Sequence, residues 1–495
     1  MKKTTRSALI IVRRILGYGL LVTFVSLISI AVYVLQSRPN LSLWQEVDLD
    51  EEFEENSGVT DFAGYLELED RLFDQLEREV YQKTPPGDAH SVNRYQKGSL
   101  TDPTSMPTNW NRTFQLEQKD PKAGVLLLHG LTDSPYSMRS LAEEFHNAGA
   151  SVIGLRIPGH GTAPSGLVEM TWQDMAAAVR LAAVHLKKSI GDKPFYVVGY
   201  SNGGALTVVY TLESLEDESL PRPDGLVLLS PEIGITKVAA LAVWQGRLGH
   251  WLGLEKLAWT SILYEYNPYK YNSFAVNAGN LAYRITLEID RRLERMSKAG
   301  ELDDFPRMLA FQSVVDATVS APAVVSRLFD RLPENDHELV LFDINHREII
   351  DHLLAKDPSE DLGKILSDSN RKFTLSIVSN SGEEGEATEA VTIRRRAAGQ
   401  STVSIENTDM TWPKEIYSLA HIALPFPGDD PFYGSGDGGK IPTLGNRALR
   451  GERGTLLITP ADMLRQKWNP FHPWLVKRAL ELTKLSAPAP AGLSN

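Results

Sequence analysis

The stretch that decides the fold is Gly199-Tyr200-Ser201-Asn202-Gly203, which directly follows the apolar run Phe195-Tyr196-Val197-Val198. This order is typical of a serine held on a sharp turn between a strand and a helix, because a side chain two residues before or after the serine would collide with the turn. Such a turn exposes the hydroxyl to a substrate carbonyl. Small residues then open an apolar helix over 203–215, so the context favours a nucleophile over a surface loop.

A second motif lies upstream, where the buried-strand run Val125-Leu126-Leu127-Leu128 is followed by His129-Gly130-Leu131-Thr132. Acyl transfer places negative charge on the former carbonyl oxygen, and preorganised backbone N–H groups stabilise that charge. The candidate donors are the N–H of Leu131 and the N–H of Asn202, the residue after the serine. The alternative for the His-Gly pair is an ordinary turn at the end of a strand.

Together with Arg156-Ile157-Pro158-Gly159-His160-Gly161-Thr162, these motifs resemble the α/β-hydrolase superfamily, and within it the monoacylglycerol-lipase and carboxylesterase group. The resemblance covers residues 120–235 well and 300–325 fairly. It implies an α/β fold with a mostly parallel sheet, a helical cap, and hydrolysis of acylglycerols or other lipid-like esters through an acyl-enzyme. Asn202 is a departure, because that group more often has Met or Gln there. Only its backbone N–H is required, so the departure bears on substrate preference.

A serine nucleophile needs a histidine to take its proton and a carboxylate to orient that histidine. In this fold the three follow one another in the order serine, acid, histidine. Asp316 follows a predicted strand and matches the family's acid position, whereas its alternative role is a helix N-cap. Asp343 is the rival acid, but it lies within a strand run that we expect to be buried.

Two histidines compete for the role of base. His346 follows the strand predicted at 338–344, so strand order and spacing favour it. His421 lies in a loop-like segment with fixed turns, and this segment resembles the histidine loop of a membrane-anchored bacterial branch of the family. We assign the base to His421 and keep His346 as the alternative. Residues 346–410 would then be an insertion before the catalytic loop. His129 and His160 are expected to shape turns near the site.

Composition limits the partners. The chain of 495 residues has 42% hydrophobic and 23% charged residues, as ordinary globular proteins do. Its net charge of -12 argues against a nucleic-acid partner. The absence of cysteine excludes disulfides, a cysteine nucleophile and thiolate metal sites. No metal, phosphate or dinucleotide motif stands out, so we expect no metal and no cofactor. The expected partner is a small-molecule or lipid ester.

The N-terminus predicts a membrane anchor. Five basic residues precede an uncharged run from Ile15 to Leu35, which is long enough to cross the hydrocarbon of a bilayer. The run lacks a convincing cleavage site, which favours a retained transmembrane helix over a signal peptide. Basic residues before the run and acidic residues at 48–55 after it predict a cytoplasmic N-terminus and a periplasmic or otherwise extracytoplasmic catalytic domain.

The chain order predicts four segments. Residues 1–36 form the cytoplasmic N-terminus and anchor. Residues 37–112 form an acidic tether, an amphipathic helix over 62–83 and a loop. Residues 113–485 form the hydrolase domain, and 486–495 a flexible tail. In the domain, apolar runs predict strands and periodic stretches predict helices. The strands are expected at 124–128, 151–157, 195–200, 225–230, 307–312 and 338–344, and the helices at 137–148, 171–190 and 203–215.

Two stretches interrupt this alternation. Residues 235–300 are rich in Trp and Tyr and are expected to form the cap, which would suit an acyl chain. The alternative for these aromatic residues is a packing layer without ligand contact. Residues 370–410 are expected to add strands. Alternatives for the whole protein are a peptidase or acyltransferase on the same three residues, or a catalytically dead, anchored binding or scaffold protein.

Overall fold

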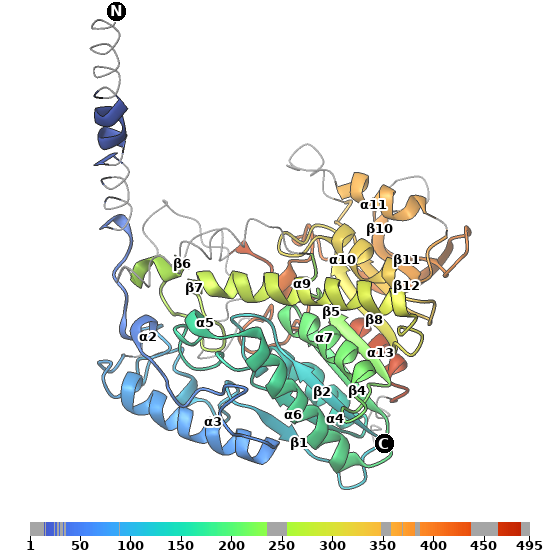
Figure 1. The fold of residues 1–495 in the computed structure, drawn as a ribbon. Helices are drawn as coiled ribbons and strands as arrows, with labels where there is room; N and C mark the ends of the chain where they lie inside the picture. The colour runs from blue at the N-terminus through green and yellow to red at the C-terminus, as the bar shows by residue number, and fades with distance from the viewer. Residues whose placement is uncertain are drawn as a thin grey trace, which may run out of the picture.

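The computed structural model describes residues 36–88, 90–234, 255–347, 358–368, 370–381, 387–436 and 464–486, with some residues between 14 and 33 (Figure 1). In this part of the chain, one ten-stranded sheet runs in the order β1-β3-β2-β4-β5-β8-β9-β10-β11-β12. The strands are β1 Phe114–Leu116, β2 Ala123–Leu128, β3 Ala150–Leu155, β4 Phe195–Tyr200, β5 Gly225–Leu229, β8 Arg307–Ser313, β9 Glu338–Phe342, β10 Thr374–Ser381, β11 Ala387–Arg396 and β12 Ser404–Thr411.

The sheet is parallel from β3 to β10, and β1, β11 and β12 pair antiparallel. This confirms the predicted mostly parallel sheet, and each of the six predicted strands has an observed counterpart. The central strands β2, β4 and β5 are buried along their whole length. Such uninterrupted burial is expected where helices cover both faces of a sheet.

Helices cover the two faces in separate layers (Figure 1). Along β2, Leu126 and Leu128 belong to one buried core and Val125 and Leu127 to another, because neighbouring strand residues point to opposite faces. The first core includes residues of α3 Phe62–Leu76, α6 Trp172–Ile190, α7 Asn202–Glu216 and α9 Val276–Ala299. The second includes residues of α4 Arg139–Asn147 and α13 His472–Leu482. Other α-helices with described bounds are α2 Leu43–Glu46, α5 Gly166–Glu169, α10 Ala321–Arg327 and α11 Pro358–Ser367.

The described part of the predicted cap consists of a 3-10 turn at Glu255–Ala258, a two-stranded sheet and α9. The two strands are β6 Trp259–Ser261 and β7 Phe274–Ala275. Residues 235–254, with Trp244 and Trp251, lie outside the described residues. The side chains of Trp259, Tyr269 and Tyr271 are buried. For these three residues, burial favours the packing-layer alternative.

Strands β10 to β12 span 374–411, which matches the prediction of added strands at 370–410 to within one residue, and they extend the central sheet. β10 pairs in parallel with β9, with Leu375 opposite Leu339. The insertion between the candidate acid and the candidate histidine at 421 therefore continues the fold rather than forming a separate unit.

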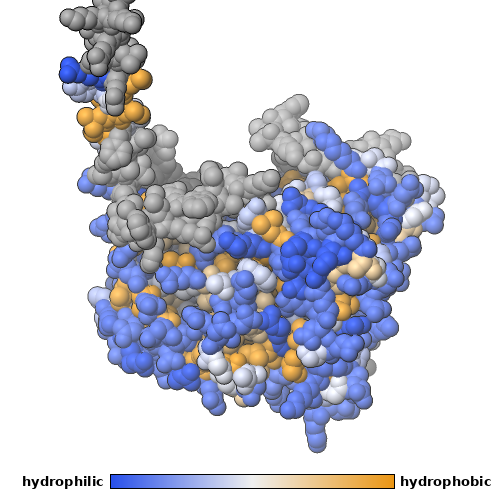
Figure 2. All heavy atoms as spheres, viewed as in Figure 1, coloured by the Kyte–Doolittle hydropathy of each residue, from blue (hydrophilic) through white to orange (hydrophobic). Residues whose placement is uncertain are grey.

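Part of the predicted transmembrane run at 15–35 lies outside the described residues. Its described positions are exposed, and this segment projects away from the domain (Figures 1 and 2). Figure 2 also shows a mostly hydrophilic surface on the domain face that it presents. In the part of the chain that the structure describes, no helix is long and apolar enough to cross a membrane.

The acidic stretch at 48–55 forms ion pairs with arginines of the following chain. Glu51 pairs with Arg71, Glu52 with Arg156, and Glu55 with Arg180. Helix α3 begins at Phe62 as predicted, ends at Leu76, and continues as a π-helical turn at Glu77–Tyr81. Because two of these acidic residues pair with arginines beyond residue 113, the stretch predicted as a tether also contacts the domain that carries the sheet.

Candidate active site

Ser201 stands on a sharply bent backbone between β4 and α7. Its φ is 54° and its ψ is -117°, a conformation that costs a non-glycine residue about 1–3 kcal/mol. A Cβ on Gly199 would lie 2.4 Å from the carbonyl oxygen of Gly203, and one on Gly203 would lie 2.2 Å from that of Leu128. Both glycines are therefore required, and the first turn of α7 packs directly on the end of β2.

Three predicted side chains meet at this turn. Ser201 Oγ lies 2.9 Å from His421 Nε2, and His421 Nδ1 lies 2.7 Å from Asp316 Oδ2. Asp316 follows β8, and His421 begins the 3-10 turn His421–Ala423. Ser201 and Asp316 thus come from loops at the carboxyl ends of parallel strands, the edge where open α/β sheets hold their ligands. The side chains of His421 and Asp316 are 5% and 0% exposed, so little solvent competes for this contact.

The carboxylate of Asp316 is held by several donors. Oδ1 accepts hydrogen bonds from the backbone N–H groups of Thr318 at 2.8 Å and Val319 at 3.0 Å. Oδ2 accepts a further bond from Gln312 Nε2 at 2.9 Å. Burial disfavours the charged form, but the charge and hydrogen bond of His421 and the two backbone N–H groups outweigh it, so the pKa of Asp316 is lowered. The group is therefore ionised at neutral pH and able to orient His421.

The alternative acid and base pair with each other. His346 Nε2 lies 2.9 Å from Asp343 Oδ2, which also accepts a hydrogen bond from Ser379 Oγ at 2.8 Å. The pKa of Asp343 is lowered, since the hydrogen bond and charge of His346 outweigh burial. Of the two candidate histidines, the structure brings His421 to Ser201.

The two predicted oxyanion donors come from turns that touch. A Cβ on Gly203 would also meet the carbonyl oxygen of His129 at 2.5 Å, so the turn after β2 packs on the start of α7. The N–H of Asn202 opens α7 and so has no acceptor within the helix. Among the described residues, neither this N–H nor that of Leu131 donates to a protein acceptor. Both remain available to a substrate oxygen.

His129 and His160 hold backbone in place. His129 Nδ1 lies 2.9 Å from the carbonyl oxygen of Gly130, and its Nε2 accepts from the N–H of Ile157 at 3.0 Å. A carbonyl only accepts and a backbone N–H only donates, so this imidazole is neutral with its proton on Nδ1. Burial lowers the pKa of His129 well below its usual value and that of His160 to about 4.

Two residues near Ser201 are not among those predicted from the sequence. Glu232 is buried, accepts a hydrogen bond from Asn202 Nδ2 at 3.1 Å, and has its pKa raised by burial. Gln312, near the end of β8, donates to Asp316. The signal for Glu232 is a charged residue three positions after a wholly apolar strand, at the same sheet edge as Ser201. Gln312 has a weaker sequence signal than Glu232, because it is only a polar residue within the apolar run of β8.

Metal ligands form no cluster in the described ranges, where no group of three or more His, Cys, Asp or Glu side chains could hold an ion. The groups around Ser201 are a hydroxyl, an imidazole, a carboxylate and two backbone N–H groups, which is the set that acyl transfer requires.

Comparison with known proteins supports the fold. Residues 119–349 match the sequence model of the family Hydrolase_4, described as serine aminopeptidase, S33. Over 129 residues, or 26% of this chain, the sequence is 35% identical to the thermostable monoacylglycerol lipase of Bacillus sp. (strain H-257). The matched part spans 48% of that relative, so the chain covers about half its length.

Two solved structures are also similar. One comes from work on LipS and LipT, two metagenome-derived lipolytic enzymes. It is 22% identical, covers 52% of this chain and 98% of its own, and has a TM-score of 0.38. The other, a monoacylglycerol lipase of Paleococcus ferrophilus, is 18% identical, covers 51% and 95%, and has a TM-score of 0.36. The family match over residues 119–349 and the sheet order together support an α/β-hydrolase fold for this part of the chain.

Proposed function

We propose that the protein is a serine hydrolase that cleaves carboxylic esters of acylglycerol or other lipid type. The observation that carries this proposal is the continuous hydrogen-bonded series from Ser201 Oγ through His421 to Asp316. The likeness to a monoacylglycerol lipase supports the substrate class. That likeness covers about half of the relative, so acylglycerol as the substrate of this chain is a proposal.

The chemistry follows from the atoms in contact. Ser201 Oγ attacks the ester carbonyl as its proton passes to His421 Nε2, and Asp316 stabilises the resulting imidazolium. The former carbonyl oxygen gains a full negative charge, which the N–H groups of Leu131 and Asn202 stabilise. His421 then protonates the leaving alcohol. Water, deprotonated by the same histidine, releases the acid from the acyl-enzyme.

The test compares Ser201→Ala with Ser214→Ala on the whole protein. Ser214 is a buried serine on α7, the helix that follows Ser201, and its hydroxyl donates to the carbonyl of Thr211. Hydrolysis of a short p-nitrophenyl ester and of a 1-monoacylglycerol should vanish in Ser201→Ala and persist in Ser214→Ala. A fluorophosphonate probe should label the second variant and not the first. A folded Ser201→Ala protein that hydrolyses esters at the normal rate would refute the mechanism. A wild-type protein that the probe does not label would indicate a catalytically dead scaffold.

A peptidase is the second candidate, because the matching family is described as a serine aminopeptidase. The same three side chains serve amide cleavage. Aminoacyl p-nitroanilides distinguish the two: we expect kcat/KM at least a hundredfold below that of the p-nitrophenyl ester. The reverse order would assign the site to peptides, and product esters formed with an added alcohol would instead identify an acyltransferase.

We also propose that residues 15–35 anchor the protein in a membrane with the catalytic domain outside the cytoplasm. The basic residues before the run and its uncharged length support this orientation. Protease added to spheroplasts should digest the domain. A domain protected until lysis would contradict the orientation, and a mature N-terminus beyond residue 30 would contradict retention of the anchor.

A further inference from the structure

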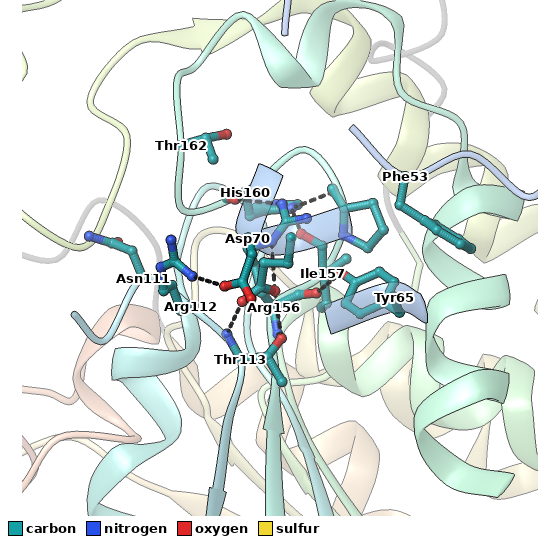
Figure 3. A network of polar contacts seen from close by, with 12 residues as sticks. Phe53, Tyr65, Asp70, Asn111, Arg112, Thr113, Arg156, Ile157, His160 and Thr162 are labelled. Carbon is teal, nitrogen blue, oxygen red and sulfur yellow. Dashed lines mark hydrogen bonds and ion pairs between the residues drawn. The ribbon is translucent and has the colours of Figure 1, made fainter. Parts of the chain in front are cut away.

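Tyr65, on the N-terminal helix α3, donates a hydrogen bond into the domain. Its ring is fully buried, and its hydroxyl lies 2.6 Å from the carbonyl oxygen of Arg156 (Figure 3). Helix α3 lies before the segment 119–349 that matches the hydrolase family. The bond therefore joins an added element to the turn that follows β3.

That bond is the first of a series that ends at a predicted oxyanion donor. The Arg156 carbonyl belongs to the same peptide unit as the N–H of Ile157, which donates to His129 Nε2 at 3.0 Å. The Nδ1–H of His129 donates in turn to the carbonyl of Gly130 at 2.9 Å.

The Gly130 carbonyl shares its peptide unit with the N–H of Leu131. Because a trans peptide is planar, fixing the direction of the carbonyl fixes the opposite direction of the N–H. The Gly130 carbonyl also accepts from the N–H of Asp133 at 3.1 Å, so two donors set the orientation of this peptide.

All members of the series point the same way. Each donor polarises the group that it binds, so hydrogen bonds in such a chain strengthen one another. The final N–H, that of Leu131, then carries more positive charge than an isolated amide would. Burial contributes by keeping His129 neutral, because a protonated imidazole could not accept from Ile157.

Side chains of the N-terminal segment also hold Arg156 itself. Its guanidinium makes two bonds to Glu52, of 3.0 and 2.9 Å, and one to Glu69 of 3.0 Å. A further bond of 3.1 Å reaches the carbonyl of His160. The Arg156 side chain has no exposed surface, and hydrogen bonds hold both this side chain and the Arg156 carbonyl. Figure 3 shows Arg156 beside Tyr65 and His160.

We propose that Tyr65 positions and polarises the N–H of Leu131, through the Arg156–Ile157 peptide and His129, so that the N-terminal segment is part of the active site. This rests on the proposed function, since it assigns a role at the same oxyanion site. Tyr65 acts through other groups and is a positioning residue.

The test compares Tyr65→Phe with Tyr95→Phe in the full chain. Tyr95 is equally buried, and its hydroxyl donates to the carbonyl of Thr162 at 2.9 Å, in the same turn but outside the series. For a p-nitrophenyl ester, Tyr65→Phe should lower kcat about fivefold with KM unchanged, which corresponds to about 1 kcal/mol of transition-state stabilisation. The inhibition constant of a trifluoromethyl ketone, which forms a tetrahedral oxyanion on the serine, should rise by the same factor.

Tyr95→Phe should lower the melting temperature as Tyr65→Phe does and leave kcat and the inhibition constant unchanged. Equal kcat values for the two variants would overturn the inference. If Tyr65→Phe does not fold, the same comparison between Glu52→Gln and Glu51→Gln decides, because Glu51 pairs with the exposed Arg71. Activity retained in Ser201→Ala would instead refute the proposed function, so the two failures are distinguishable.

Discussion

Replacing each candidate histidine in turn is the sharpest test of the site. In His421→Ala, Ser201 loses the group that takes its proton and becomes an unactivated alcohol. Asp316 keeps hydrogen bonds from Thr318, Val319 and Gln312, so the change leaves no buried carboxylate without donors and the fold should persist. We expect kcat/KM to fall by about four orders of magnitude or more, which is about 5.5 kcal/mol or more of transition-state stabilisation.

His346→Ala is the matched change. It leaves Asp343 bonded to Ser379 Oγ and to the N–H of Ile344. Since His346 is not in contact with Ser201, kcat/KM should stay within about tenfold of the wild-type value, or about 1.4 kcal/mol. The assay is steady-state hydrolysis of a short p-nitrophenyl ester, with circular dichroism to show that both variants fold.

A double variant adds a second criterion. Groups that act as one unit lose nearly all activity with the first removal, so Ser201→Ala combined with His421→Ala should be little worse than either alone. An inactive His346→Ala together with an active His421→Ala would refute the reasoning. The sheet position after β9 would then hold the base, and β10 to β12 would be an appendage rather than an insertion before the catalytic loop.

The remaining predictions concern stability. Ser201→Gly should be more stable than Ser201→Ala by about 1 kcal/mol, because glycine adopts the φ of 54° without strain. The greater entropy of glycine in the unfolded chain offsets part of this gain. Equal denaturation midpoints for the two variants would argue against a strained turn. Burial lowers the pKa of His472 to about 4. The folded state thus binds fewer protons than the unfolded state between about pH 6.5 and 4, so stability is full above that window and falls through it by about 1.4 kcal/mol per pH unit for this group. His472→Gln should show a shallower decline in urea denaturation across this range, and parallel curves would contradict the assignment.

The sheet was predictable because its signal is local. Strands buried on both faces leave uninterrupted apolar runs, and all six such runs correspond to observed strands, with ends shifted by at most two residues. The serine turn was predictable for a related reason. Its two glycines are each required by contacts that the turn itself creates, with α7 and with the end of β2.

The histidine could not be settled by the same local argument. Counting strands favours His346, because a histidine after the strand following the acid is the simplest arrangement. The chain instead adds β10, β11 and β12 to the sheet before reaching His421, 105 residues beyond Asp316. The spacing of apolar residues does not predict that the loop with His421 lies beside Ser201.

The N-terminal segment shows most clearly what local sequence patterns cannot predict. Its helix was predicted from the spacing of apolar residues, yet that spacing treats Tyr65 as one more buried ring. The Tyr65 hydroxyl donates to the carbonyl of Arg156, which is 91 residues away in the sequence. The next member of the series is His129, which accepts from the N–H of Ile157. A buried arginine with two carboxylates is expensive to desolvate, so such a network is weak support for stability alone and a better candidate for fixing one arrangement of the chain. The arrangement that it fixes is the peptide whose N–H donates to His129, and through this peptide we propose that the distant acidic residues influence the chemistry at Ser201.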